Sequence, residues 1–464
     1  MDRDRLRSLD LAHVWHPYTQ MQDLADDDFP IIERAEGRRL SDVDGRAYWD
    51  GVASIWLNVH GHRVPHIDAA IQAQLGKVAH STLLGQGNVP SIELAARLAR
   101  LAPEGLERVF YSDNGSTAVE GALKIALQAW HLRGRPQKNR ILSFEGGYHG
   151  DTLGCVAAAY VPAFHAAFRG ALPQPTEPLP WPDTYRGVTD ADGRPLTDPE
   201  AVCAATLEAV DARLRIEGPR TAAVIVEPMV QGVGGIRVMP SGFLRGLRDL
   251  CTEHEVLLVA DEVATGFGRT GRAFACDHEQ VTPDLMAVGK GITGGYLPLA
   301  ATLATEGLYE TFLGPHEEGR QLFHGHSYTG NQLGCAAALA SLDLLEPMLP
   351  GLPARGRRIA ERLAASAEEP FVGDVRGLGF MHGLELVADK ATKRPFPAAA
   401  RAAWRVFRHA RARGLLVRPY ANIALFVPPL ASTEEELDEM LGLYAQALRD
   451  ARGDLEAAVP ALTA

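Results

Sequence analysis

The sequence predicts an α/β protein in which helices cover both faces of a mostly parallel sheet, followed by a smaller α+β domain. Two observations carry this prediction. Short apolar runs alternate with helical patterns over the first two thirds of the chain, which is typical of a parallel sheet with helical crossovers. After Gly330 the pattern changes to a small-residue helix and paired strand-like runs. The chain has 464 residues, of which 46% are hydrophobic, so it can bury the core of two or more domains.

The large domain is expected to span residues 61–330. Its strand-like runs are apolar and short, at residues 109–111, 141–144, 222–226, 256–260, 285–288 and 299–304. Residues 172–195 are rich in proline and polar side chains and are interpreted as a surface excursion. The C-terminal small domain, residues 331–464, should contain strand pairs at 376–387 and 415–427 and a closing helix at about 433–452.

Lys290 stands where an apolar run ends in a glycine-flanked lysine, within DLMAVGKGITGG (residues 284–295). An amine there leaves the interior at the end of a strand, so its ammonium is desolvated and the neutral form can attack an aldehyde. These are the requirements of a Schiff-base lysine. A lysine at a strand end is more often a solvated terminus, so Lys290 alone does not decide between the two.

Asp261 follows a second buried-type run, residues 255–260, upstream of Lys290. Ligands of open α/β sheets collect at the carboxyl ends of the strands. A carboxylate buried there needs a cationic partner, and the protonated ring nitrogen of pyridoxal phosphate is such a partner. By itself, Asp261 could equally be the N-cap of the next helix.

Two glycine-containing turns follow predicted strands. Asn114 to Thr117 link a strand to an amphipathic helix, and a helix start with free amides and hydroxyls is suited to a phosphate, although serine and threonine there are also common caps. The second turn, in NRILSFEGGYHGDT (residues 139–152), carries Tyr148, which could stack on a planar cofactor or simply pack on the core.

Together these segments resemble class III aminotransferases of fold type I, which use pyridoxal phosphate. The resemblance covers essentially the whole chain and rests on VEPMVQG (226–232), DEVATGFGRTG (261–271) and GKGITGG (289–295), in that order. It implies a large domain with a mostly parallel sheet, a smaller α+β domain, and an N-terminal segment, residues 1–60, that joins the small domain and covers the active site. It also implies a homodimer with shared active sites.

Further local resemblances favour the branch of this family that acts on 8-amino-7-oxononanoate in biotin biosynthesis. They are WHPYTQM (15–21), DGVASIWLNVHGH (50–62), GGYHGDT (146–152), LFHGHSYTGNQLGCAAALASL (322–342) and VRPY (417–420). Ala264 points the same way, because many relatives that act on ornithine or 4-aminobutyrate have glutamine at this position. Another class III omega-aminotransferase activity remains the alternative.

The resemblance assigns roles around the cofactor. Lys290 would form the Schiff base and move the proton of the transamination, and Asp261 would hold the pyridinium nitrogen. Val263 and Tyr148 would pack on the two faces of the ring. Two residues of the first turn, Gly115 and Ser116, would bind the phosphate.

Other roles fall on the substrate side and on the neighbouring subunit. Ser327, preceded by His326, matches the position that completes the phosphate site from the second subunit, where many members have threonine after proline. The serine keeps the hydroxyl, and the contribution of His326 stays open. Gly325 lies where the substrate approaches the backbone.

Tyr18 and Arg418 match the positions that recognise the oxononanoate, the tyrosine near the amine and the guanidinium at the far carboxylate. Arg418 lies between two apolar runs with little polar company, which suggests a charge that waits for an anion. An ordinary ion pair with a nearby acidic group is the alternative.

Ile55 and Trp56 bear on the amino donor. Enzymes of this branch that use S-adenosylmethionine usually have two adjacent tryptophans where this chain has Ile55 and Trp56. Loss of the first aromatic ring removes a surface on which a sulfonium could stack. The donor is therefore S-adenosylmethionine by family default, with lysine as the alternative.

Composition limits the partners to small molecules. A formal net charge of −12 and a sequence pI near 5.7 argue against nucleic acid. We expect no membrane span, because no stretch approaches 18 uncharged apolar residues, and the N-terminus MDRDRLRSLD is too charged for a signal peptide. The five cysteines form no CxxC pair, which fits a cytoplasmic protein.

A metal hydrolase and a non-catalytic binding protein are two other classes of function. His60, His62 and His66, with His324 and His326, could indicate a metal hydrolase, but such histidines without a paired carboxylate motif more often have turn or core roles, so no metal is expected. A binding protein that merely keeps the fold would have little reason to retain the lysine, the aspartate and the phosphate turn together.

Overall fold

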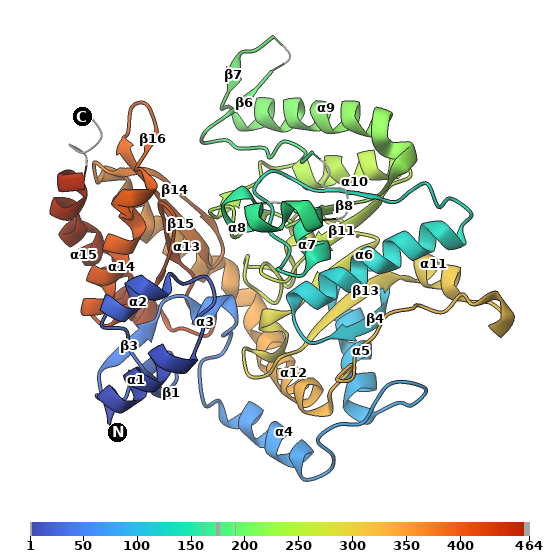
Figure 1. The fold of residues 1–464 in the computed structure, drawn as a ribbon, viewed down its shortest axis with the longest axis horizontal. Coiled ribbons are helices and arrows are strands. Elements are labelled where there is room, and N and C mark those ends of the chain that lie inside the picture. The colour runs from blue at the N-terminus through green and yellow to red at the C-terminus, as the bar shows by residue number, and fades with distance from the viewer. Residues whose placement is uncertain (1, 160, 173–176, 191, 459–464) are drawn as a thin grey trace.

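The computed structural model describes residues 2–159, 161–172, 177–190 and 192–458. Figure 1 shows two bodies of secondary structure beside each other. One is built around a sheet of six strands, and the other contains the described residues nearest both chain ends. The N-terminal helices α1 (Arg3–His13) and α2 (Met21–Asp26) lie against the second body, next to the C-terminal helices.

The six-stranded sheet has the order β4-β13-β12-β11-β8-β5. Its strands are β4 (Leu106–Ser112), β5 (Arg140–Leu142), β8 (Thr221–Val226), β11 (Leu257–Asp261), β12 (Leu285–Val288) and β13 (Ala300–Thr305). Strands β5, β8, β11 and β12 pair in parallel, whereas β13 is antiparallel to both of its neighbours. The predicted mostly parallel sheet is therefore confirmed, and each of the expected strand-like runs overlaps one strand of it.

The register of the sheet brings two predicted site residues to the same edge. Asp261, the last residue of β11, pairs with Ala287 of β12. Lys290 follows β12 after Gly289 alone. Because the two strands run in parallel, both side chains lie at the carboxyl edge, where open α/β sheets bind their ligands.

Helices cover both faces of the sheet, and the alternation of side chains along each strand decides which residues meet which helix. In β11, Leu257 and Val259 pack in one apolar cluster with α6 (Gly115–Leu132), whereas Leu258 packs in another with α10 (Phe243–Glu253). Because both faces are covered, β11 and β12 are buried along their whole length, which explains why they read as continuous apolar runs.

Other helices surround this sheet. They include α4 (Pro65–Leu75), α5 (Val89–Leu101), α7 (Leu153–Ala158), α8 (Pro162–His165), α9 (Pro199–Glu217), α11 (Glu306–Tyr309) and α12 (Gln332–Leu345). The short segment α3 (Ala53–Trp56) has positive φ angles and is a left-handed turn. The small-residue helix expected after Gly330 is α12, which packs against α4 and α5. Its alanines Ala337 and Ala340 pack in one apolar cluster with Ile67 of α4.

The second body contains two sheets. One has the order β14-β15-β19-β18, formed by β14 (Val372–Leu378), β15 (Met381–Asp389), β18 (Arg418–Tyr420) and β19 (Ile423–Phe426), with β16 (Arg394–Pro395) paired to β15. The other has the order β1-β2-β3-β17, formed by β1 (Ile32–Glu36), β2 (Arg39–Asp42), β3 (Ala47–Asp50) and β17 (Leu415–Leu416). Helices α13 (Leu352–Ala364), α14 (Ala402–Ala412) and α15 (Glu434–Ala458) pack with them.

The pairing of β3 with β17 joins the N-terminal and C-terminal segments of the chain. Strand pairs and a closing helix were expected in the C-terminal part, and β14, β15, β18, β19 and α15 occupy those places. The domain boundaries at residues 60 and 330 stay predictions.

The predicted surface excursion and the predicted absence of a membrane span can both be compared with the structure. Of the excursion at residues 172–195, residues 173–176 and 191 lie outside the described residues, and the remainder includes a small pair of strands, β6 (Val188–Thr189) and β7 (Pro195–Leu196). One helical stretch, Gln332–Glu368, has the length and mean hydropathy of a membrane span when up to two charged residues are allowed in the window. Half of its apolar window is buried in the protein, as in a core helix, and the absence of a membrane partner stays a prediction.

We predict that Gly379→Ala destabilises the protein. Gly379, in the turn between β14 and β15, has a φ of +62°, and a Cβ there would lie 2.3 Å from the carbonyl carbon of Thr270. Left-handed strain and overpacking against backbone together should lower the free energy of unfolding by about 2–4 kcal/mol. Denaturant unfolding measures this change. The control Gly442→Ala, in open space on α15, should raise stability by up to about 1 kcal/mol, and an equal effect of both changes would contradict the argument.

Candidate active site

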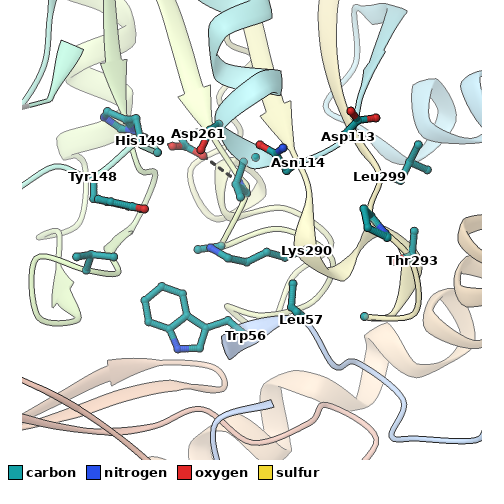
Figure 2. A pocket seen from close by; sticks show the side chains of 18 of the residues that line it. Trp56, Leu57, Asp113, Asn114, Tyr148, His149, Asp261, Lys290, Thr293 and Leu299 are labelled. Carbon is teal, nitrogen blue, oxygen red and sulfur yellow. Dashed lines mark hydrogen bonds and ion pairs between the residues drawn. The ribbon is translucent and has the colours of Figure 1, made fainter. Parts of the chain in front are cut away.

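A cavity of about 540 Å³ opens at the carboxyl edge of the six-stranded sheet. Figure 2 shows Asp261, Lys290, Tyr148, His149 and Trp56 around it. The predicted site residues that line the cavity are Trp56, Gly115, Ser116, Tyr148, Asp261, Val263 and Lys290. The structure thus brings together residues from segments that lie far apart in the sequence.

Asp261 is only 4% exposed, and both of its carboxylate oxygens are engaged. Oδ2 lies 2.7 Å from Nδ1 of His149, and Oδ1 accepts a hydrogen bond of 3.1 Å from the backbone N–H of Val263. No helix begins at this residue, because the chain continues in turns until the 3₁₀ turn Ala275–His278. The alternative interpretation of Asp261 as a helix N-cap is therefore wrong.

His149 is a site residue whose role the sequence analysis missed. Its imidazole is buried, and its bond to Asp261 joins the turn after β5 to the end of β11. A carboxylate can only accept, so the proton of this hydrogen bond sits on Nδ1 of the imidazole. The motif GGYHGDT displayed the histidine, but nothing in its spacing indicated which of the many carboxylates it would meet.

Lys290 reaches into the cavity from the loop after β12, with a left-handed φ of 44°. Its Nζ lies 5.0 Å from the centroid of the Trp56 ring, and within the described residues it has no ion pair or hydrogen bond. Burial lowers the pKa of Lys290, and the negative charges of Asp261 and Glu227 offset part of that effect. The amine is therefore easier to deprotonate than that of a solvated lysine.

Glu227, directly after β8, is a second residue whose role the sequence analysis did not assign. Its Oε1 accepts from the N–H of Tyr148 at 3.1 Å, and its Oε2 accepts from the N–H of Gly232 at 2.8 Å. Burial raises the pKa of Glu227 to about 7. Because Glu227 holds the backbone of Tyr148, it helps to define one wall of the cavity.

The N-terminus of α6 also lines the cavity, through Asn114, Gly115 and Ser116. Asn114 caps the helix through a reciprocal pair: Oδ1 accepts from Thr117 N at 3.1 Å, and Thr117 Oγ1 accepts from Asn114 N at 3.2 Å. The amides of Gly115 and Ser116 remain available at the positive end of the helix dipole. A Cβ at Gly115 would lie 2.4 Å from Cγ1 of Val263, so glycine is needed for this close packing.

Tyr18 and Tyr148 meet at one carboxylate near the cavity. The hydroxyl of Tyr148 donates to Oδ2 of Asp151 at 2.7 Å, and the hydroxyl of Tyr18 donates to Oδ1 of the same residue. Burial and the bond to Asp151 raise the pKa of Tyr18 to about 12. Asp151 lies in the motif GGYHGDT without an assigned role, and the structure makes it the link between the two tyrosines.

Arg418 is the first residue of β18 and is exposed. In the described part of the chain it makes no salt bridge or side-chain hydrogen bond, which disfavours the alternative of an ordinary ion pair. A guanidinium in this state is available to an external anion.

Six predicted site residues do not line this cavity: Tyr18 and Arg418, described above, and Ile55, Gly325, His326 and Ser327. Gly325 and Ser327 are exposed, and the backbone carbonyl of Ser327 accepts from Nε2 of His80 at 2.7 Å. His326 lies with Nδ1 3.3 Å from Oδ2 of Asp113. The side chain of Ile55 is 43% exposed. Their roles in the site stay predictions.

The histidines considered as metal ligands have other partners. Nε2 of His60 lies 3.0 Å from Oγ of Ser341, and His62 and His66 lie 3.0 Å from Asn58 and Asp343. Over the described ranges, no group of three His, Cys, Asp or Glu side chains is placed to hold a metal ion. These contacts favour the structural interpretation of the histidines.

The residues present fit pyridoxal phosphate. The ring of this cofactor needs an acidic partner for its nitrogen, two flat walls, an anion site for its phosphate and an amine for its aldehyde. Asp261, the pair Val263 and Tyr148, the start of α6 and Lys290 supply these in one cavity. The glycine at position 115 keeps the helix end close to Val263, as a compact planar ligand requires.

Comparisons with known proteins agree with this fit. The family model "Aminotransferase class-III" matches residues 22–448. The adenosylmethionine-8-amino-7-oxononanoate aminotransferase of Nitratidesulfovibrio vulgaris is 52% identical over 442 residues, which cover 94% of this chain and 80% of that protein. The enzyme of the same name from Geobacter sulfurreducens is 47% identical over 94% of this chain and 96% of its own length.

Solved structures give the same result. The crystal structure of the adenosylmethionine-8-amino-7-oxononanoate aminotransferase from Methanocaldococcus jannaschii is similar with a TM-score of 0.90 and 40% identity, over 97% of this chain and 99% of that one. An (S)-enantioselective omega-transaminase from Thermomicrobium roseum is similar with a TM-score of 0.91 and 34% identity, over 97% and 99% of the two chains. This chain belongs to the class III aminotransferases and has their fold type I architecture.

Proposed function

We propose that this protein transfers an amino group to 8-amino-7-oxononanoate and so makes 7,8-diaminononanoate for biotin biosynthesis, with pyridoxal phosphate as cofactor. The observation that carries the proposal is the cavity in which Lys290, Asp261 and the N-terminus of α6 converge. Relatives with this named activity match this chain over 94% of its length, which supports the choice of acceptor.

The chain's own residues hold the cofactor and move the proton. When bound, pyridoxal phosphate supplies an electron sink for the carbon that loses its proton. Asp261, oriented by His149, would keep a positive charge on the ring nitrogen, and the amides of Gly115 and Ser116 would bind the phosphate. The amine of Lys290 would hold the cofactor through its aldehyde and would be the group that carries the proton.

The acceptor is recognised at the other end of the site. The guanidinium of Arg418 binds its far carboxylate, since it is exposed and unpaired with described side chains. Tyr18 lies near the amine end, where Asp151 orients its hydroxyl. Gly325 lies where the acceptor approaches the backbone.

The donor is S-adenosylmethionine, as in the names of the relatives. One observation favours lysine as a second candidate. Ile55 stands where a tryptophan would offer a stacking surface, and the neighbouring Trp56 already has the ammonium of Lys290 at 5.0 Å from its ring. A sulfonium donor would therefore have little aromatic surface of its own.

The protein is a cytoplasmic homodimer with shared active sites and has no nucleic acid or membrane partner. Ser327 and His326 lie outside the cavity of their own chain, as expected if they complete the phosphate site of the second subunit. Exposed apolar side chains provide a surface for that subunit at Leu84, Val89, Ile92, Phe323 and Tyr328. The five cysteines are free, which fits a reducing compartment.

The proposal predicts formation of the diamine. Holoenzyme is incubated with 8-amino-7-oxononanoate and either S-adenosylmethionine or lysine, and 7,8-diaminononanoate is measured by mass spectrometry. Lys290→Ala should bind the cofactor without a covalent link and give no turnover, because no other described amine lies in the cavity. Absence of product with either donor, or normal turnover in Lys290→Ala, would refute the proposal.

A second prediction concerns the acceptor site. Arg418→Ala should weaken binding of 8-amino-7-oxononanoate by about 2–5 kcal/mol, as expected for loss of a hydrogen-bonded charge pair, and should change donor binding much less. KM values for both substrates measure this difference. Arg394→Ala, at an exposed arginine in β16, is the matched control and should leave both values near wild type. Equal weakening of both substrates by Arg418→Ala would place this residue elsewhere.

A third prediction concerns pH. Only the neutral amine captures the cofactor, so covalent capture by the apoprotein should speed up as pH rises. Burial lowers the pKa of Lys290, so the rate should level off below pH 10.5, the ordinary value for lysine. Borohydride trapping followed by peptide mapping reports capture at this residue. A midpoint at or above that of an exposed lysine would contradict the assignment.

A further inference from the structure

The segment that carries Trp56 has an unusual backbone. Ala53 and Ser54 have φ angles of 47°, and Ile55 and Trp56 have φ angles of 67°. The bonds from Trp56 N to Val52 O, at 2.9 Å, and from Leu57 N to Ala53 O, at 2.8 Å, close this segment into one turn of left-handed helix. None of these four residues is glycine.

Such a turn does not form by local preference. In a left-handed helix the Cβ atom crowds the following carbonyl oxygen, and a β-branched residue such as Ile55 tolerates this least. Four strained residues in a row persist only when the surrounding structure holds them, and strain of this kind gathers at functional sites. The contacts that hold the turn should therefore indicate its function.

One clasp comes from the N-terminal sheet. Asp50, the last residue of β3, is 1% exposed, and its backbone pairs with β17. Its Oδ1 accepts from the N–H of Ser54 at 2.9 Å, and its Oδ2 accepts from the hydroxyl of Ser54 at 2.8 Å. Nε2 of His62 lies 3.5 Å from the same Oδ2. The carboxylate thus grips the second residue of the turn at two points.

A second clasp comes from the loop after β11. Arg269 is 2% exposed, and among the described residues its guanidinium donates only to the backbone carbonyls of Pro428 at 2.7 Å, Asn58 at 3.2 Å and Trp56 at 3.5 Å. One guanidinium therefore joins the exit of the turn to the strand-end loop that begins at Asp261. The negative charge of Asp50 acts favourably on the buried guanidinium.

The turn delivers the Trp56 ring to the catalytic amine. Figure 2 shows the ring beside Lys290 in the cavity, and the distance from Nζ to the ring centroid is 5.0 Å. Behind the ring lies Gly232, where a Cβ would be 2.8 Å from the indole. Gly232 is itself held by Glu227. The ring is thus confined on one side by backbone and on the other by the lysine.

We propose that Asp50 and Arg269 are positioning residues for the transamination, because they clasp a strained left-handed turn that holds the Trp56 ring against the amine of Lys290. The inference rests on the proposed function, since it gives the turn a part in the step that Lys290 carries out. If the Trp56 ring is displaced, the amine of Lys290 is no longer held in the geometry that proton transfer requires. Loss of this geometry lowers kcat more than it weakens substrate binding.

Two substitutions at Ser54 separate the effect of backbone strain from the effect of the hydrogen bonds to Asp50. Ser54→Ala and Ser54→Gly both delete the hydroxyl, but only glycine removes the left-handed penalty. Asp50→Ala removes the carboxylate, whereas Asp50→Asn keeps an acceptor for the N–H and a partner for the hydroxyl. The matched control is Ser91, a buried serine in the right-handed helix α5, changed to alanine and to glycine. Each holoenzyme is assayed for kcat, KM, thermal unfolding and circular dichroism of the cofactor absorption band.

We expect Ser54→Gly to unfold at a higher temperature than Ser54→Ala, the reverse of the order at Ser91. Asp50→Ala should lower kcat about tenfold or more, with a smaller change in KM, and should alter the cofactor dichroism, while Asp50→Asn should restore most of both. Unchanged kcat and dichroism in Asp50→Ala, or the ordinary alanine-over-glycine order at Ser54, would overturn the proposal. If Asp50→Ala does not fold, the Ser54 pair decides by the same readouts. Wild-type protein that binds no cofactor or makes no diamine refutes the proposed function instead, and the unfolding order at Ser54 still tests the strain.

Discussion

The buried carboxylate of Asp261 is the constraint on which the site depends. A carboxylate removed from water is costly unless hydrogen bonds or a cation satisfy it. Here the backbone of Val263 and the imidazole of His149 occupy both oxygens from the protein side. The parallel register of β11 with β12 then brings Lys290 to the same edge of the sheet. Acid and amine therefore share one cavity because of strand pairing.

Elsewhere in the cavity, too, polar side chains bind backbone amides. Glu227 uses both oxygens on the amides of Tyr148 and Gly232, and Asn114 uses its side chain to cap α6. These side chains hold main chain in place, so the walls of the cavity are formed by the protein's own hydrogen bonds. A preformed site of this kind loses little entropy on binding a planar cofactor.

The two bodies of the protein meet around the lysine. The left-handed turn at residues 53–56 is anchored to the N-terminal sheet through Asp50 and to the loop after β11 through Arg269. Arg269 also bonds to Pro428 near the C-terminal strands. Segments from the beginning, middle and end of the chain are thus joined through Arg269 to the turn that carries Trp56, whose ring lies beside Lys290.

The sequence by itself determined the strands, their mostly parallel arrangement, and the strand-end positions of Asp261 and Lys290, because apolar runs and their glycine-rich ends are local patterns. It also identified Tyr148 and the start of α6 as candidates. Only the tertiary structure decided that His149 bonds to Asp261, that Glu227 supports Tyr148, that Asp151 joins Tyr148 to Tyr18, and that residues 53–56 turn left-handed. Each of these features depends on partners that lie far away in the chain or on strain imposed from outside the segment. Long-range partners and imposed strain produce no periodic pattern in the sequence.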